Sequence, residues 1–185
     1  MTKEQVEKRE PRGVLDYISL AVTTFGVGYL PLAPGTYGSL VAIGFYSILA
    51  SKFATFRYSA SPNSPEVLVA AIHAVILVAF LLFILLGIWA ASRSVELLGN
   101  TDAPEAVVDE VIGQLVVFLF IPFTSSWLLI GAGFLLFRLF DIWKPYPIDN
   151  LQILPGGIGV CADDILAGVY AGVCLSIIYA ITLSV

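Results

Sequence analysis

Charged side chains are scarce in this chain of 185 residues, because Asp, Glu, Lys and Arg together make up only 12% of it. Soluble domains carry about 25% charged residues, so the composition argues against a soluble protein. Basic residues are fewer than acidic ones, 9 against 14, which gives a net charge of −5. This balance argues against a nucleic-acid-binding protein, since such proteins present basic surfaces. An anionic substrate stays compatible with it if a metal ion supplies local positive charge.

Cysteine and histidine are also rare. The two cysteines, Cys161 and Cys174, form no disulfide framework, and we interpret Cys161 as a small packing residue rather than a nucleophile. The single histidine, His73, lies inside an apolar run with no acidic residue near it in the sequence, so we expect it to take no part in catalysis. A zinc site built from His and Cys side chains is therefore not expected.

Apolar sequence is what the chain has in abundance, with 58% hydrophobic residues and a mean hydropathy of +0.93. Residues 67–91 are uncharged and exceed the length of about 20 residues that crosses the hydrocarbon core of a bilayer. Residues 38–51 and 165–185 are further candidate membrane helices. We predict one all-α domain over residues 1–185, a polytopic membrane helical bundle. Its polar N-terminal segment, residues 1–13, is expected to be a frayed or short surface helix without a stable partner.

Two apolar runs are interrupted near their middle. Four glycines and two prolines between Phe25 and Ser39 cannot continue a lipid-exposed helix, so we expect a glycine-rich loop there, covered by protein or facing a watery cavity. Pro122 interrupts the second run, which predicts a helical hairpin with arms at 103–121 and 126–142. Each arm is then about 25 Å long, and both of its polar ends return to the same side.

Acidic and basic side chains gather at the ends of these predicted helices. They are Asp102, Glu105, Asp109 and Glu110, then Arg138, Asp141 and Lys144, and then Asp163 and Asp164. A charge beside hydrocarbon must be hydrated, paired or bound to a cation. Oxygen ligands without a His or Cys cluster favour magnesium over zinc. The distribution of Lys and Arg predicts that these groups, and the glycine-rich loops, lie on the cytoplasmic face.

Part of this acidity has a structural interpretation. Asp102 and Glu105 have the spacing of a capping box at the start of a helix, with Pro104 in its first turn. Asp163 and Asp164 are expected to open the last helix, where an acid suits the helix dipole. A cap needs only one acid, so the second of this pair is left without a structural explanation.

Four blocks of sequence together carry a resemblance to a known family. They are Gly26-x-Gly28 … Ala33-Pro34-Gly35-Thr36-x-Gly38-Ser39, Val108-Asp109-Glu110-x-x-Gly113, Phe137-Arg138-Leu139-Phe140-Asp141-Ile142-Trp143-Lys144-Pro145-Tyr146-Pro147-Ile148, and Gly156-Gly157-x-Gly159 … Asp163-Asp164-x-x-Ala167-Gly168. In this order they resemble the phosphatidylglycerophosphatase A family. Two positions depart from its pattern: Tyr146 replaces the usual Trp, and Pro155 stands where members often carry His. Either that histidine is dispensable or the activity of this protein is altered.

The resemblance implies a magnesium-dependent phosphomonoesterase of the bacterial inner membrane, which hydrolyses phosphatidylglycerophosphate to phosphatidylglycerol and phosphate. The catalytic and metal-binding residues it implies are Asp109, Glu110, Asp141, Asp163 and Asp164, with Glu110 as a further ligand or the general base. The phosphate-binding residues it implies are Arg138, Lys144, Thr36, Ser39, Gly35 and Gly157. Attack by water and an aspartyl-phosphate intermediate both remain open.

Two other functions are compatible with the same residues. One is a non-catalytic homologue that binds an anionic lipid head group, for which Pro155 is the best support. The other is a divalent-cation transporter with acids along its pathway. The transporter is disfavoured because the acids lie at helix ends on one face rather than at the midplane, and because inverted repeats are not apparent.

Overall fold

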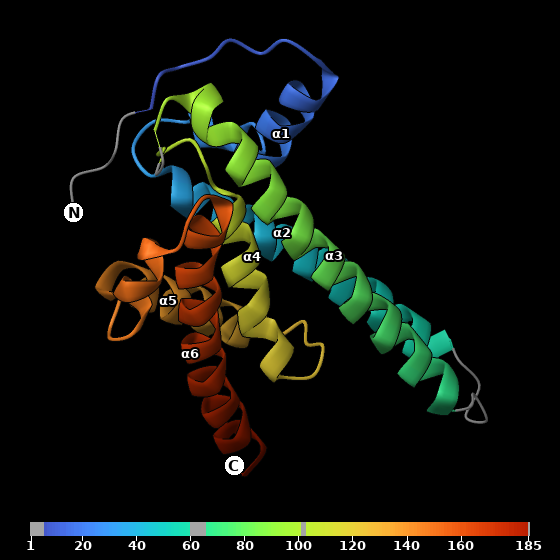
Figure 1. The fold of residues 1–185 in the computed structure, drawn as a ribbon. Helices are drawn as coiled ribbons and strands as arrows, with labels where there is room; N and C mark the ends of the chain where they lie inside the picture. The colour runs from blue at the N-terminus through green and yellow to red at the C-terminus, as the bar shows by residue number, and fades with distance from the viewer. Residues whose placement is uncertain (1–5, 60–65, 101–102, 185) are drawn as a thin grey trace.

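The computed structural model describes residues 6–59, 66–100 and 103–184, which form helices and no β-strand (Figure 1). The α-helices are α1 (Val14–Thr24), α2 (Pro34–Ser59), α3 (Glu66–Leu98), α4 (Val108–Val117), α5 (Trp127–Trp143) and α6 (Gly157–Ser184). Short 3-10 helices are η1 (Val27–Tyr29), η2 (Phe118–Phe120) and η3 (Ile148–Ile153). The predicted all-α class is confirmed.

Three helices in the described part of the chain are long and apolar enough to cross a membrane: Pro34–Phe56, Glu66–Leu98 and Gly157–Ser184. The most apolar stretch of α3 has a mean hydropathy of 3.1, and none of that stretch is buried inside the protein. A helix that is apolar on every side and uncovered by protein is stable only in lipid. The protein is therefore a membrane protein.

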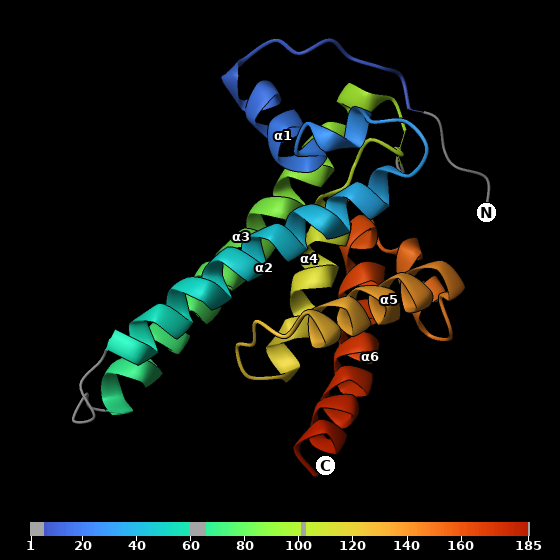
Figure 2. The same ribbon diagram turned by 180° about the vertical axis from the view of Figure 1, so that it is seen from behind.

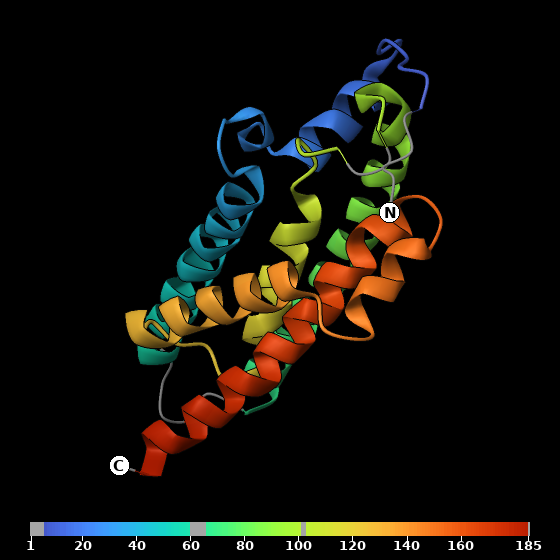
Figure 3. The ribbon, with the colours of Figure 1, turned by 90° about the vertical axis from the view of Figure 1, so that its left-hand side faces the viewer.

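Helix α2 packs against α4, and α3 packs against α1 and α6. The later part of α2 and the first part of α3 extend in the same direction beyond the other helices (Figure 2). Helices α4, α5 and α6 pack together, and α5 crosses α6 (Figure 3). Phe118, Phe137 and Leu175 belong to the buried cluster that joins these three helices. The starts of α2, α4 and α6 lie near one end of the molecule, and the C-terminus lies at the other (Figure 1).

Two glycines allow α4 and α6 to cross at close range. A Cβ on Gly168 would collide with the carbonyl oxygen of Gly113, and a Cβ on Gly113 would lie 2.6 Å from the carbonyl oxygen of Asp164. Small residues at a crossing let helix backbones approach each other in membranes. Glu110 lies about one turn before Gly113, and Asp164 about one turn before Gly168. The crossing therefore places the acids of the two helices next to each other.

The predicted hairpin is present, but its first arm is shorter than expected. Helix α4 has ten residues and is about 15 Å long, because it begins at Val108 rather than near residue 103. The backbone of the preceding segment is used elsewhere: the amide of Val107 donates a hydrogen bond to the carbonyl of Thr23, at 2.9 Å. Residues 121–126 form the non-helical turn of the hairpin.

Both structural interpretations of the acids need correction. Glu105 lies in a turn before α4, so it is not the reciprocal partner of a capping box there, and Asp102 lies outside the described residues. Helix α6 already begins at Gly157, so Asp163 and Asp164 lie in its second turn and do not cap it. The glycines at 157 and 159 are part of this helix. Only glycine fits at these positions, because a Cβ would collide with α3 or with the 152–154 segment.

The N-terminal segment has a partner from residue 6 onward, contrary to expectation. The amides of Val6 and Arg9 donate hydrogen bonds to the carbonyls of Gly99 and Glu96, at 3.2 and 2.9 Å. Asp16 of α1, whose side chain is only 2% exposed, forms ion pairs with Arg9 at 2.7 Å and Arg93 of α3 at 2.8 Å. The hydrogen bonds from the Arg9 side chain and the Arg12 amide hold the pKa of Asp16 well below its usual range. This buried acid joins the N-terminal segment, α1 and α3.

Candidate active site

Three carboxylates from two helices converge at the α4–α6 crossing. Asp109 and Glu110 lie in the first turn of α4 and Asp164 in the second turn of α6. One oxygen from each lies within 4.8 Å of the others. Oδ1 of Asp109 and Oε2 of Glu110 are buried and have no hydrogen-bond partner among the described residues. Unpartnered carboxylate oxygens facing one another fit a hard divalent cation such as magnesium.

Two cations border this group from the end of α5. Nη1 of Arg138 lies 2.8 Å from Oδ2 of Asp141, and Nζ of Lys144 lies 2.6 Å from Asp163 and 3.3 Å from Asp141. Burial lowers the pKa of Lys144, but the surrounding carboxylates, that of Asp164 first, outweigh this effect and hold its pKa above the ordinary value. Lys144 is therefore a permanent cation at this site.

The five acids divide by their surroundings. Asp141 and Asp163 are held by cations, and Asp163 also accepts a hydrogen bond from Nε2 of Gln152 at 3.1 Å. Asp164 pairs with Lys144 at 3.6 Å and joins the two acids of α4 at the helix crossing, while Oδ1 of Asp163 is also buried without a described hydrogen-bond partner. With all five carboxylates ionised, the two cations leave this described cluster with a net charge of −3. A bound divalent cation would offset most of that charge.

The start of α2 closes the third side of the site. A Cβ on Gly35 would collide with the carboxylate of Glu110 and would lie 3.2 Å from Nη1 of Arg138, so the close approach requires glycine. Thr36, in the same turn, is partly exposed. Ser39 is buried, and its hydroxyl donates a hydrogen bond to the carbonyl of Gly35 at 3.1 Å. The N-termini of α2 and α4 both carry partial positive charge here, which favours an anionic ligand.

Gly157 lies away from the carboxylates. Its amide donates a hydrogen bond to Oγ of Ser92 at 2.8 Å, and a Cβ there would collide with the carbonyl oxygen of Ile88. The structure therefore gives Gly157 a packing contact with α3. Pro155 is exposed in the turn before α6, next to Gly156, which also lies against Ser92. The position that departs from the family pattern belongs to this α3-facing turn.

No role is predicted from the sequence for two glutamines near the site, Gln114 and Gln152. Gln114 is fully buried, and neither polar atom of its amide has a partner among the described residues. It lies four residues after Glu110, so both are on one face of α4. Its signal in the sequence is that it is the only amide in the apolar run that follows the acids. Gln152, the partner of Asp163, comes from η3 and has no comparable signal.

Comparison with known proteins decides the family. The family model described as Phosphatidylglycerophosphatase A matches residues 20–179. The chain belongs to the phosphatidylglycerophosphatase A family. Phosphatidylglycerophosphatase A of Escherichia coli is 33% identical over 152 residues, which are 81% of this chain and 76% of that protein. The protein of the same name from Haemophilus influenzae is 34% identical over 159 residues, 85% of this chain and 86% of its own length.

A third relative carries a different name. A protein of Bacteroides thetaiotaomicron, provisionally named a phosphatidylinositol-3-phosphatase, is 35% identical over 160 residues, 84% of this chain and 89% of that protein. No solved structure matches the chain. The predicted family and the predicted enzyme class, a phosphatidylglycerophosphatase, are confirmed.

The sequence blocks typical of phosphatidylglycerophosphatase A meet at the site described above. The glycine-rich block supplies Gly35, the second block Asp109 and Glu110, the third Arg138 and Lys144, and the last Asp163 with Asp164. The first three blocks lie far apart in the chain, and the last two are separated only by residues 149–155. Their convergence at one site accounts for the pattern of short blocks in a chain that is otherwise mostly apolar.

Proposed function

We propose that the protein hydrolyses phosphatidylglycerophosphate to phosphatidylglycerol and phosphate with magnesium as cofactor, in the bacterial inner membrane and on its cytoplasmic side. The observation that carries the proposal is the group of Asp109, Glu110 and Asp164, with oxygens within 4.8 Å of one another, beside Arg138 and Lys144. Membership of the family supports the substrate.

Asp109, Glu110 and Asp164 are the residues that would hold the metal ion. Magnesium bound there supplies charge that offsets the phosphate oxygens and lowers the pKa of a coordinated water. Asp141 and Asp163 also carry oxygen atoms near this group, and their predicted role as ligands is part of the proposal. In the described contacts they hold Arg138 and Lys144 in place.

The cations and helix ends bind the substrate phosphate. The guanidinium of Arg138 presents several donors to phosphate oxygens, and Lys144 adds a second positive charge. The amide of Gly35, in the first turn of α2, adds a donor at a helix N-terminus, and the partly exposed Thr36 can contribute its hydroxyl. Glu110 is the candidate general base, because its second carboxylate oxygen has no partner among the described residues and can accept the proton of an attacking water.

The orientation in the membrane rests on the distribution of basic residues. Arg9, Arg12, Arg93, Arg138 and Lys144 belong to the segments around the site, whereas Lys52 lies toward the far end of α2. Positive residues are enriched on the cytoplasmic side of membrane proteins. The N-terminal segment and the site would then face the cytoplasm, with the C-terminus on the opposite side.

The test is phosphate release from the purified protein with phosphatidylglycerophosphate or phosphatidylinositol 3-phosphate, each with magnesium and after chelation. We expect release from phosphatidylglycerophosphate that is lost on chelation and restored by magnesium, but poorly by zinc. Faster phosphate release from phosphatidylinositol 3-phosphate would instead indicate that the substrate is the lipid for which the Bacteroides relative is named. No release from either lipid with magnesium present would contradict the proposal and favour a binding protein.

Magnesium binding has a second readout in protein stability. A ligand that binds only the folded protein raises its melting temperature. We expect magnesium to raise the melting temperature of the parent but not of Asp109→Asn. An equal rise in both proteins would remove the acid cluster as the binding site.

A further inference from the structure

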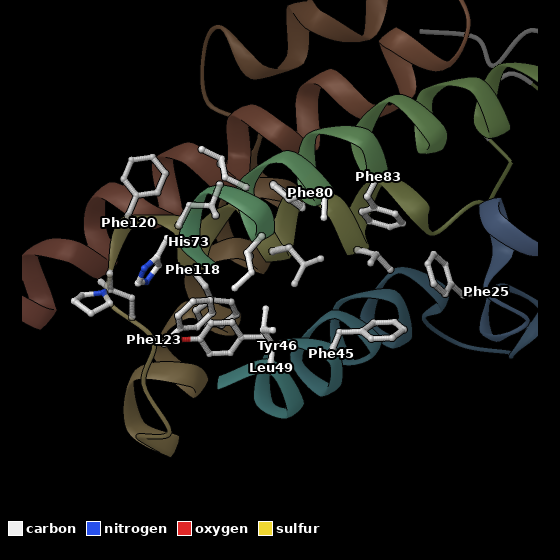
Figure 4. Close-up of a pocket in the computed structure, with 18 residues that line it drawn as sticks. Phe25, Phe45, Tyr46, Leu49, His73, Phe80, Phe83, Phe118, Phe120 and Phe123 are labelled. Carbon is white, nitrogen blue, oxygen red and sulfur yellow. The ribbon is translucent and has the colours of Figure 1, made fainter. Parts of the chain in front are cut away.

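An apolar pocket of about 900 Å³ lies between α2 and α3. Figure 4 shows its side chains pointing inward from these two helices and from the α4–η2 segment. Most of its bulk comes from aromatic rings: Phe25, Phe45, Phe80, Phe83, Phe118 and Phe123. The volume falls within the range of about 300–1,000 Å³ that is usual for ligand sites. A pocket of this size is large enough to hold a ligand.

Aromatic contacts bound the pocket at both ends. At one end the ring of Phe25 lies 6.3 Å from that of Phe45 on α2 and 6.3 Å from that of Phe83 on α3. At the other end His73 lies 4.9 Å from Phe53 and 5.8 Å from Phe123, between ring centroids. His73 and Phe83 are ten residues apart on one helix, which separates the two ends by about 15 Å. The lining therefore extends for about 15 Å along α3, a candidate membrane helix.

The Phe25 end adjoins the candidate active site. The carbonyl of Thr23, two residues before Phe25, accepts a hydrogen bond from Val107, which directly precedes α4. Val111, which lines the pocket, follows Glu110 by one residue. No acidic residue lines the pocket at either end, and at the distant end Nδ1 of His73 lies 2.8 Å from the carbonyl of Val69. The pocket therefore reaches α4 at Val111, the residue next to Glu110, without a carboxylate in its own lining, and extends from there among apolar side chains.

The pocket is open toward the surface that faces lipid. Lining residues on three sides remain partly exposed: Phe45 by 53%, Leu77 by 48% and Leu119 by 50%. Water is a poor occupant, because it needs several polar partners and the lining offers few. An acyl chain is apolar, elongated and already present in the surrounding bilayer.

We propose that this pocket binds one acyl chain of the phospholipid substrate, which enters laterally between α2 and α3 with its phosphorylated head group at the carboxylates. The inference rests on the proposed function, because it names how the same site receives its lipid. It predicts that the enzyme discriminates substrates by their tails as well as by their head groups.

The test compares variants that fill the pocket with a matched variant that does not. Ala79→Phe and Leu77→Trp add bulk to the lining, whereas Ala71→Phe adds it to an exposed position of α3 outside the lining. Each protein is assayed with long-chain phosphatidylglycerophosphate in vesicles and with its soluble dihexanoyl analogue. We expect the ratio of long-chain to short-chain kcat/KM to fall about tenfold in the filled variants, the equivalent of roughly two displaced methylene groups. Ala71→Phe should keep the parent's ratio.

Equal loss on both substrates, or no loss on either, would overturn the acyl-chain site. A second measurement, the position of lipid cross-links, is independent of activity. The protein is placed in vesicles containing phosphatidylglycerol that carries a photoreactive group at the end of one acyl chain. We expect cross-links concentrated on the lining of α3 and on residues 118–123 in the parent, and fewer in Leu77→Trp. Uniform labelling around α3 in both proteins would show only surrounding lipid and would overturn the proposal. A parent that cross-links in this way and releases no phosphate would contradict the proposed function alone.

Discussion

Asp163 and Asp164 are neighbours in the sequence, and their side chains have different surroundings. Oδ2 of Asp163 is held by Lys144 at 2.6 Å and by Gln152 at 3.1 Å, whereas its Oδ1 is buried without a described partner. Asp164 joins Asp109 and Glu110 at the helix crossing, where two of the carboxylate oxygens have no partner in the described structure. At the scale of the residue, what separates these acids is therefore which charges they meet across the helix interface.

The first prediction concerns the acids that meet at the α4–α6 crossing. Asp109→Asn and Asp164→Asn keep the size of the side chain and remove its charge. We expect each to lower the rate of phosphate release by about 100-fold or more, the scale of losing a preorganised charge-stabilising group. Glu105→Gln, in the turn before α4, should release phosphate at the parental rate. Parental rates in both Asn variants would disprove the role of this cluster.

The second prediction concerns Gln114. A buried amide without partners in the described structure costs about 1–3 kcal/mol in desolvation, so Gln114→Leu should raise the free energy of unfolding by a similar amount, seen as a higher melting temperature. It should also slow turnover, since stability and activity commonly oppose each other at polar sites. Gln152→Leu is the matched control, because its amide has a partner and its loss should bring no stabilisation. A Gln114→Leu protein that is less stable and fully active would contradict this interpretation.

Helix crossings set the geometry of the site at the scale of the element. Gly113 and Gly168 hold α4 and α6 at backbone contact, and this contact aligns Glu110 with Asp164. A Cβ on Gly131, in α5, would meet no described atom of a neighbouring element within 4 Å, so this glycine takes no part in a crossing.

The third prediction follows from this contrast. Gly168→Ala must push α4 away from α6, so we expect a lower melting temperature and a loss of magnesium-dependent stabilisation as the acids separate. Gly131→Ala should be neutral or more stable by up to about 1 kcal/mol, because alanine favours the helix. The check is a thermal melt of both variants with and without magnesium. Equal behaviour of the two variants would show that the crossing does not set the site.

The sequence predicts the bounds of a helix correctly where the residues that set them lie within that segment, and incorrectly where contacts with another helix set them. Pro122 marked the hairpin correctly, because a proline disrupts its own helix. The sequence pattern predicts the start of α4 several residues too early, because the amide of Val107 donates its hydrogen bond to the carbonyl of Thr23 on another helix. The start of α6 was placed too late for a similar reason, since Gly157 and Gly159 are packing contacts rather than loop residues.

The candidate site was predictable in composition but not in arrangement. Its acids and cations stood out because charge is rare in an apolar chain. Which of the acids lie close to the cations and which gather at the α4–α6 crossing depends on contacts between α4, α5 and α6, which no spacing within one segment encodes. Asp16 was missed for the same reason, because its partner Arg93 is 77 residues away.

The fourth prediction concerns the whole molecule and its orientation. Cys161 and Cys174 are first replaced, and single cysteines are then placed at Asn150 and Ser184, both exposed. Helix α6 lies between these positions and is long enough to span the membrane. A membrane-impermeant thiol reagent should reach Ser184→Cys in intact cells and Asn150→Cys only after the inner membrane is permeabilised. Labelling of both positions from one side would refute the proposed topology.

The ion pairs of Asp16 have a consequence for the order of events during synthesis. Arg9 precedes Asp16 by seven residues, so the acid of α1 has a cationic partner as soon as it leaves the ribosome. Arg93 follows 77 residues later, which at about 5–20 residues per second is a delay of roughly 4–15 s. During that interval Arg9 is the only described ion-pair partner of Asp16 that has been synthesised. Synthesis of α3 then adds the long-range ion pair between Asp16 and Arg93 to the local one with Arg9. The two ion pairs together join the N-terminal segment, α1 and α3.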